Sequence, residues 1–445
     1  MNAAEQRKRL FDFITNFVIW LCECASFAFL WYKNYGRVFW VRGNYAIIMM
    51  YGLFIFFVTK SVNGYNSSYM RVSDRIISHL IAIVTSGVIG YIFICIAVRD
   101  YVPVWPNACM ALVQFAFALL WLLLMGALQV RIFPPRRIAL IYGSYPPERF
   151  LSKLRDKADK YEVALVLDIR DGMEKVTESI TQFEGVVLYD LPAEERNELM
   201  KYCYKASLRA YVVPKISDIL LEGSERLYLI DTPLYLSKNT GLGPDERFVK
   251  RLADIVISLL GIVIASPFML IIAICVKCYD RGPVFYKQTR LTRDGKTFSM
   301  LKFRSMTVDA EEDGAQLATK EDSRITPVGR VIRNIHFDEL PQLFNVLKGD
   351  MSMVGPRPER PEIFAAYEKT IPEFPFRLRV KAGMTGYAQV YGRYNTAPID
   401  KLKLDLTYIQ EYSYWLDIKL LLLTVRLIFL KEYAEGVDPE DPKNR

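Results

Sequence analysis

The first third of the chain alternates long apolar segments with short polar ones. Four apolar segments cover residues 13–32, 45–59, 76–98 and 101–130. The third and fourth contain no Asp, Glu, Lys or Arg, and each exceeds the ~20 residues that a helix needs to cross the hydrocarbon core of a bilayer. The pattern predicts a domain of four transmembrane helices over residues 1–135, in which the second helix has the least distinct ends.

Basic residues predict the orientation of these helices, because the cytoplasmic loops of membrane proteins are enriched in Lys and Arg. With the N-terminus inside, the cytoplasmic side collects Arg7, Lys8, Arg9, Lys60, Arg71, Arg75, Arg131, Arg136 and Arg137, and the opposite side collects Lys33, Arg37, Arg42 and Arg99. Both ends of the bundle are therefore expected in the cytoplasm, with the first segment retained as an anchor. Glu23 falls inside the first span, where a carboxylate is costly unless it is paired, and we expect it to serve helix packing rather than transport.

Residues 136–247 change to a pattern of short β-rich runs separated by helical ones. Strands are predicted at 138–142, 163–167, 185–188 and 209–213, and helices at 147–160 and 193–205. This alternation is typical of a Rossmann-like module with a parallel sheet. The first strand leads into Gly143-Ser144-Tyr145-Pro146, which lacks the glycines of a dinucleotide-binding turn. We therefore expect no NAD here, and an assembly or regulatory role.

A fifth apolar segment follows a linker rich in Gly and Pro. Basic residues flank it on both sides, which favours both of its ends in the cytoplasm. Ser266 and Pro267 lie in its middle, where the proline breaks the helix and the serine hydroxyl can satisfy a carbonyl that the proline leaves free. The sequence predicts a re-entrant helix over residues 253–278 that enters one leaflet and returns.

The remaining segments complete an α/β domain over residues 248–434. Residues 309–322 are acidic and are predicted to form a mobile surface loop. Residues 415–430 are apolar but contain charges, which is typical of an interfacial amphipathic helix. The tail, 435–445, is polar and predicted to fray.

The strongest chemical signal lies in residues 338–359, which read DELPQLFNVLKGDMSMVGPRPE. Pro341 is typical of a first helical turn, so Asp338 and Glu339 are placed at a helix N-terminus, a position that also suits bound phosphate. Arg357 lies between Pro356 and Pro358, in a rigid loop that limits the entropy it loses on binding an anion. The alternative is that the acidic pair only caps the helix.

This combination suits phosphoryl transfer through a covalent carboxylate. An Asp can attack phosphorus, but an anion must then approach an anionic diphosphate. Cationic side chains and a divalent metal offset that repulsion, and Mg²⁺ held by few carboxylates plus substrate oxygens fits such a site. Lys302 and Arg304 alternate on a predicted strand, 298–306, and so share one face. They are either phosphate and carboxylate partners or part of a solvated basic strand.

Composition narrows the class of protein. The chain has 445 residues, is 52% hydrophobic and has a net charge of +8, which suits a membrane protein that binds anionic surfaces or phosphates. It contains no nucleic-acid-binding motif. Cys275 and Cys278 form a C-x-x-C without a second pair, so we interpret them as apolar filler rather than a zinc or redox site. Only two histidines are present, and of these His336 is close in sequence to Asp338.

Several blocks in this order resemble the bacterial sugar transferase family, the monotopic polyprenol-phosphate phosphoglycosyl transferases. The resemblance covers residues 248–430. Its blocks are Lys250-Arg251 with Asp254, Ser266-Pro267, 282–288 (GPVFYKQ), 302–306 (KFRSM), the 338–359 stretch, and 383–390 (GMTGYAQV). Ala382 departs from the Pro that relatives often carry before the glycine, and this change does not touch the chemistry.

The resemblance implies that the chain transfers glucose- or galactose-1-phosphate from a UDP-sugar to undecaprenyl phosphate and releases UMP. It implies that Asp338 is the nucleophile and binds Mg²⁺, that Glu339 assists, that Arg357 grips a phosphate, and that Lys302 and Arg304 orient the carboxylates. The expected location is the bacterial cytoplasmic membrane with the catalytic domain facing the cytoplasm, and a homodimer is compatible with the domain layout. A membrane-anchored nucleotide-sugar oxidoreductase and a non-catalytic export scaffold stay open as alternatives.

Overall fold

The computed structural model describes residues 3–67, 70–237, 241–307, 322, 324–392 and 396–428. The chain divides into two compact units, Met1–Val213 and Pro214–Arg445. The predicted loop 309–322, apart from Asp322, and the predicted tail 435–445 lie outside the described residues.

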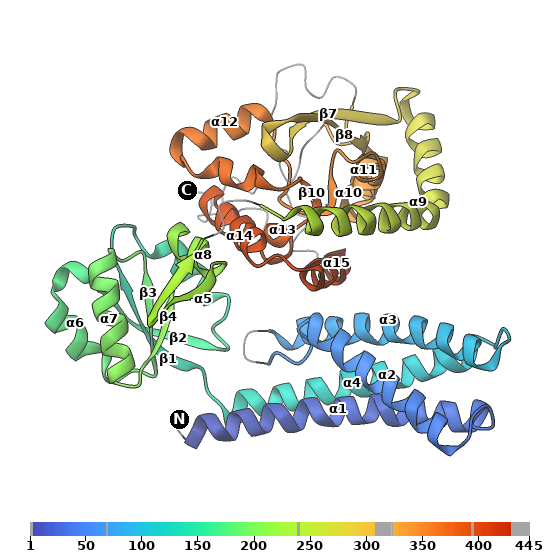
Figure 1. The fold of residues 1–445 in the computed structure, drawn as a ribbon, viewed down its shortest axis with the longest axis horizontal. Helices are drawn as coiled ribbons and strands as arrows, with labels where there is room; N and C mark the ends of the chain where they lie inside the picture. Colours follow the sequence, from blue (N-terminus) through green and yellow to red (C-terminus); the bar gives the residue numbers. More distant parts are fainter. Residues whose placement is uncertain are drawn as a thin grey trace. The chain divides into compact units, whose positions relative to one another are not determined.

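Four long helices form the first part of unit 1 (Figure 1). They are α1 (Ala3–Tyr35), α2 (Val41–Ser61), α3 (Val72–Val98) and α4 (Trp105–Ile132). Each coincides with a predicted apolar segment and is long and apolar enough to cross a membrane. Helix α1 begins ten residues before its predicted start because the polar N-terminal residues continue the helix, and α2 extends past both of its predicted ends.

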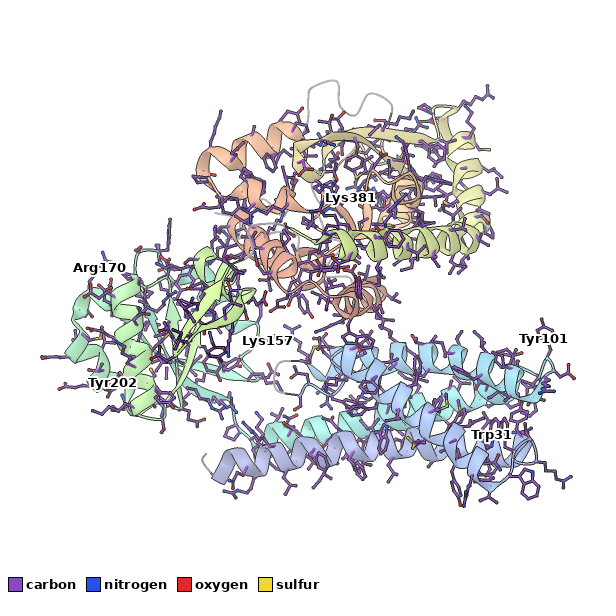
Figure 2. All side chains as sticks on the ribbon, in the orientation of Figure 1. Trp31, Tyr101, Lys157, Arg170, Tyr202 and Lys381 are labelled. Carbon is purple, nitrogen blue, oxygen red and sulfur yellow. The ribbon has the colours of Figure 1, made fainter. Side chains whose placement is uncertain are left out.

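Polar side chains join these helices inside an apolar core. Phe27 and Tyr51 stack with ring centroids 4.0 Å apart, and Trp31 (labelled in Figure 2) donates a hydrogen bond to Asn44 Oδ1 at 2.8 Å. Glu23 is buried, and its Oε1 lies 3.2 Å from His79 Nδ1 on α3. Pairing across helices is what the expected packing role of Glu23 requires.

The second part of unit 1 is a four-stranded parallel sheet in the order β2-β1-β3-β4. The strands are β1 (Arg136–Tyr142), β2 (Tyr161–Asp168), β3 (Gly185–Tyr189) and β4 (Arg209–Val212), with helices α5 (Glu148–Arg155), α6 (Met173–Ile180) and α7 (Ala193–Lys205). Figure 1 shows α6 and α7 beside the sheet. This confirms the predicted parallel α/β region. The first predicted helix ends at Arg155 instead of 160, because the chain turns there to enter β2.

Backbone amides in the turn after β1 form hydrogen bonds within the protein. The amides of Gly143 and Ser144 donate to the carbonyls of Tyr189 and Asp190 at 3.2 and 3.4 Å. A Cβ on Gly143 would lie 2.5 Å from the Asp190 carbonyl oxygen, so this glycine permits a close backbone contact. Neither amide is therefore offered to a pyrophosphate.

Unit 2 begins with α8 (Ile216–Glu222) and an antiparallel hairpin, β5 (Glu225–Leu229) and β6 (Thr232–Leu236). These elements were predicted to belong to the Rossmann-like module, 136–247. They cluster instead with the C-terminal unit, where α8 packs on α14 (Pro398–Gln410) and a Cβ on Gly223 would meet the Gln410 side chain at 2.5 Å.

The rest of unit 2 surrounds two short pairs of strands. Strands β7 (Phe285–Leu291) and β8 (Thr297–Phe303) are antiparallel, and β9 (Ser352–Val354) and β10 (Gly383–Thr385) are parallel. The helices are α9 (Pro244–Asp280), α10 (Pro327–Asn334), α11 (Gln342–Lys348), α12 (Pro361–Thr370), α13 (Tyr387–Tyr391), α14 and α15 (Tyr414–Ile428), with 3₁₀ turns η3 (Phe337–Glu339) and η4 (Phe374–Arg379).

Helix α9 bends sharply between its two halves (Figure 1), and Pro267 lies within it. Proline removes the hydrogen bond to the carbonyl four residues earlier, which belongs to Val263. Ser266 Oγ donates to that carbonyl at 2.8 Å. The hydroxyl therefore satisfies the freed carbonyl, as predicted from the Ser-Pro pair.

Polar contacts attach the first half of α9 to α11 and β9. Arg251 donates to the carbonyls of Val346 and Leu347 at the end of α11, both at 2.7 Å. Asp254 accepts from Ser352 Oγ at 3.0 Å and from the Met353 amide at 2.8 Å. These are two of the three charged residues of the first family block, and their observed contacts hold the helix.

Three glycines allow β9 and β10 to approach closely. A Cβ on Gly383 would lie 2.0 Å from the Gly355 nitrogen, and a Cβ on Gly386 would lie 2.1 Å from the Gly355 oxygen. The glycines of the two blocks around residues 355 and 383 are thus needed to bring the Arg357 loop against β10.

This contact makes Gly383→Ala a test of the fold. We expect the substitution to destabilise unit 2 by about 2 kcal/mol or more, because backbone atoms on both sides leave the methyl group no space. Thermal unfolding of the detergent-purified protein measures the loss. Gly261→Ala is the matched control, since its nearest neighbour is the end of the Leu343 side chain at 3.3 Å, which can rotate away. Equal stability of the two variants would contradict the role assigned to the glycine contact.

Candidate active site

The acidic pair lies in a tight turn before α11. Phe337–Glu339 form a single 3₁₀ turn, and His336 precedes it with a left-handed φ of 57°. Pro341 is the N-cap of α11, so the helix begins just after the pair, close to its predicted start. A non-glycine residue in the left-handed region is uncommon and is often found near functional sites. The turn presents Asp338 and Glu339 side by side but in different surroundings.

Two cations hold Glu339. Its Oε1 accepts from Lys302 Nζ at 2.7 Å and from Arg357 Nη2 at 2.8 Å. Lys302 comes from β8 and Arg357 from the loop after β9, so three separate segments meet at one oxygen atom. The structure therefore brings together three of the residues that the sequence singled out.

These contacts separate the acidities of the two carboxyls. Burial favours the neutral form of Glu339, but the charges of Arg357 and Lys302 outweigh it and hold the pKa of Glu339 far below its usual range. Asp338 is also buried, at 9% exposure, and burial raises its pKa, which the more distant charge of Lys302 only partly offsets. Glu339 is thus a fixed anion, whereas Asp338 retains a proton more readily.

Asp338 is also the less constrained carboxylate. Among the residues that the structure describes, none donates a hydrogen bond to its side chain. A buried carboxylate without a donor is costly, and its oxygens remain free for a metal ion or a phosphorus atom. Within the described residues, no three His, Cys, Asp or Glu side chains cluster as metal ligands. A single carboxylate fits Mg²⁺, which keeps waters and uses substrate phosphate oxygens for its remaining ligands.

The loop that carries Arg357 is fixed along its backbone. The carbonyl of Pro356 accepts from the Gly383 amide at 2.9 Å, and the carbonyl of Pro358 accepts from Arg290 Nη1 at 2.9 Å. The side chain of Arg357 is 48% exposed and reaches across to Glu339. A small pocket beside the loop is lined by Pro356, Arg357, Pro358, Glu359 and Arg377, together with apolar residues.

Arg304 lies apart from this cluster. Strand β8 ends at Phe303, although the Arg304 amide still donates to the Val284 carbonyl at 3.0 Å. Its guanidinium pairs with Asp280 at the end of α9 and is packed against Gly282, where an added Cβ would require the Arg304 side chain to shift. The structure thus gives Arg304 an anchoring contact to α9 and brings it to neither carboxylate of the pair.

Other contributors were not singled out from the sequence. Arg290, on β7, and Arg377, on η4, contact the Arg357 loop from beneath. From the sequence, the basic run of Arg377, Arg379 and Lys381 before the glycine turn could be interpreted as a nucleotide or membrane contact, but not as support for the Arg357 loop. No local pattern marks such residues, because their function depends on contacts between distant segments.

Comparisons with known proteins identify the family. The model of the bacterial sugar transferase family matches residues 245–431. A UDP-N-acetylgalactosamine-undecaprenyl-phosphate N-acetylgalactosaminephosphotransferase of Aeromonas hydrophila is 34% identical over 313 residues, which cover 66% of this chain and 67% of the relative. The chain belongs to the bacterial sugar transferase family.

Further relatives of this sugar transferase carry different substrate names. A UDP-glucose:undecaprenyl-phosphate glucose-1-phosphate transferase of Klebsiella pneumoniae is 42% identical, with 66% of this chain and 61% of the relative covered. A galactosyl transferase, CpsE, of Streptococcus agalactiae is 39% identical over 41% of this chain and 42% of its own length. The matches therefore span about two thirds or less of the length of these relatives, and the names include three different sugars.

Proposed function

We propose that this sugar transferase moves a hexose-1-phosphate from a UDP-sugar to undecaprenyl phosphate and releases UMP, as the first membrane step of surface polysaccharide synthesis. The observation that carries the proposal is the contrast between the two adjacent carboxyls. Glu339 is held by two cations, whereas Asp338 is buried and receives no hydrogen bond from the described residues. The names of the relatives support the donor and acceptor classes.

Asp338 acts as the nucleophile in a two-step transfer. An ionised oxygen of Asp338 attacks the phosphorus that carries the sugar. The new bond joins this oxygen to phosphorus, and the bond from phosphorus to the bridging oxygen breaks, so UMP leaves with that oxygen. A phosphate oxygen of the lipid then attacks the same phosphorus and releases the Asp338 carboxylate unchanged.

The neighbouring groups manage charge during these steps. Arg357 is half exposed and contacts Glu339, from which it can reach a phosphate oxygen of either substrate. Lys302 is less exposed, donates to Glu339, and acts on Asp338 through its charge. Asp338, with the phosphates of the donor, would hold Mg²⁺, which neutralises phosphate charge when bound. Glu339 positions the two cations and thereby keeps them from pairing with Asp338.

The proposal also requires both substrates to meet on one side of the bilayer. The nucleotide sugar is a cytoplasmic solute and the lipid phosphate lies at the membrane surface. Helix α9 meets the length and composition of a span, but its bend at Pro267 and basic flanks suit a re-entrant segment that enters and leaves from the cytoplasmic face. The catalytic domain would then face the cytoplasm at the inner membrane.

Substitution of the nucleophile gives the direct test. Asp338→Asn should abolish UMP release and the covalent sugar-phosphate adduct, while Glu339→Gln should leave some adduct. Asp338→Asn should not lower the melting temperature. The folded state binds the Asp338 proton more tightly than the unfolded state does, so ionisation near pH 7 disfavours folding, and Asn removes that cost. Mass spectrometry detects the adduct, and normal turnover by Asp338→Asn would rule out the mechanism.

The pH profile tests the environment of Asp338. Only the ionised carboxyl attacks, so kcat/KM should fall as decreasing pH protonates Asp338, whose pKa is raised by burial. Lys302 lowers this pKa, so Lys302→Met should move the acid limb to higher pH. Lys296→Met, in the exposed turn between β7 and β8, serves as the control. UMP release measured across pH checks the shift, and identical acid limbs in both variants would contradict it.

Labelling tests the path of α9. In a cysteine-free background, Phe248→Cys and Tyr279→Cys place exposed thiols before and after the Ser266-Pro267 break. A membrane-impermeant maleimide should label both in inside-out vesicles and neither in intact spheroplasts. Tyr101→Cys, between α3 and α4 (Figure 2), should show the opposite result. Labelling of the two α9 positions from opposite faces would exclude the re-entrant path.

A further inference from the structure

A buried ion pair lies beneath the Arg357 loop. Arg377 Nη2 is 2.6 Å from Asp405 Oδ2, and the two residues are 2% and 1% exposed. Asp405 comes from α14 and Arg377 from η4, so the pair joins two elements that are not adjacent in sequence. The same guanidinium lies over the Phe374 ring, with 4.9 Å from its carbon to the ring centroid. Arg377 is therefore held in one orientation.

That orientation directs Arg377 at the loop. Its Nη2 donates to the backbone carbonyl of Arg357 at 3.0 Å, and its Nη1 lies 3.7 Å from Glu359 Oε1. The carbonyl of Arg357 belongs to the residue whose side chain reaches Glu339 at the active site. The buried guanidinium of Arg377 thus connects Asp405 to the backbone that carries the exposed guanidinium of Arg357.

The contact completes a series along the loop. Four consecutive carbonyls accept hydrogen bonds: Pro356 from the Gly383 amide, Arg357 from Arg377, Pro358 from Arg290, and Glu359 from the Leu291 amide at 3.0 Å. Of the four donors, Arg377 alone contacts the residue that carries the active-site guanidinium. Its loss would free the loop at that residue while the other three contacts remain.

We propose that Arg377 and Asp405 are positioning residues for the transfer reaction, which hold the backbone of Arg357 so that its guanidinium meets the substrate phosphate. The inference rests on the proposed function. A buried ion pair is a weak source of stability, because the cost of removing both charges from water offsets their attraction. A positioning role accounts for an arginine whose guanidinium donates to one carbonyl and pairs with two carboxylates at once, which the single ammonium group of a lysine could not reproduce. A displacement of about 1 Å at a reacting group can lower a rate ~100-fold.

A double-mutant cycle separates positioning from general stability. Asp405→Asn in the wild-type background should lower kcat/KM for UMP release by about tenfold or more, since it releases Arg377. In the Arg357→Ala background the same change should have less than about a twofold effect, because the group being positioned is gone. Asp280→Asn removes the partner of Arg304 and is the matched control, with the same fold-change expected in both backgrounds.

Hydrogen exchange provides a measurement that does not depend on activity. Asp405→Asn and Arg377→Lys should both increase deuterium uptake in the peptide that covers 355–360, and Asp280→Asn should not. If no UDP-sugar in a panel yields UMP with the wild-type protein, the proposed function fails. The exchange result still tests whether Arg377 and Asp405 hold the Arg357 loop. Equal effects of Asp405→Asn in both backgrounds, or unchanged exchange at 355–360, would overturn the positioning role.

Discussion

The geometry of the candidate site depends on one carboxylate oxygen that accepts hydrogen bonds from two cationic side chains. Glu339 Oε1 draws Lys302 from β8 and Arg357 from the loop after β9 to the same point, and thereby fixes where the strand, the loop and the 3₁₀ turn meet. It also places the two adjacent acids, Asp338 and Glu339, in different environments. Because Glu339 accepts both hydrogen bonds, Asp338 is buried and receives none from the described residues. Burial also raises the pKa of Asp338. Two neighbouring carboxyls whose environments shift their acidities in opposite directions are a recurring arrangement in catalysis.

The sequence predicted the elements better than it predicted their partners. Apolar length and the βα alternation were enough for α1 to α4 and for the parallel sheet, because both signals are set by local periodicity. The Ser266–Val263 hydrogen bond was also predictable, since proline frees a specific carbonyl nearby. Arg304 shows the limit. Strand alternation predicts that it shares a face with Lys302, but its guanidinium pairs with Asp280 on α9, a partner that alternation alone does not reveal.

The candidate site was predictable only where its residues are close in sequence. Asp338, Glu339 and the Pro356-Arg357-Pro358 loop lie within one stretch, and the resemblance to a family marked them. The contacts that hold this stretch come from Arg290, Arg377 and Asp405, which are separated from it by many residues and carry no pattern of their own. The same is true of the close contact between Gly355 and Gly383, because glycine in a sequence does not reveal which backbone will approach it.

The buried ion pairs of unit 2 share one role, which is to fix the orientation of the segments that they join. Three ion pairs join segments that are not adjacent in the sequence: Lys250 with Asp417, Arg304 with Asp280, and Arg377 with Asp405. In each pair, removing charged groups from water costs free energy. If stability alone governed these positions, apolar pairs of similar size would serve as well. Directed contacts, however, fix orientation as well as proximity. Two of the pairs involve residues near the start and at the end of α9, and the third contacts the Arg357 loop. The costly pairs therefore lie where unit 2 must keep this helix and the Arg357 guanidinium in a defined relation.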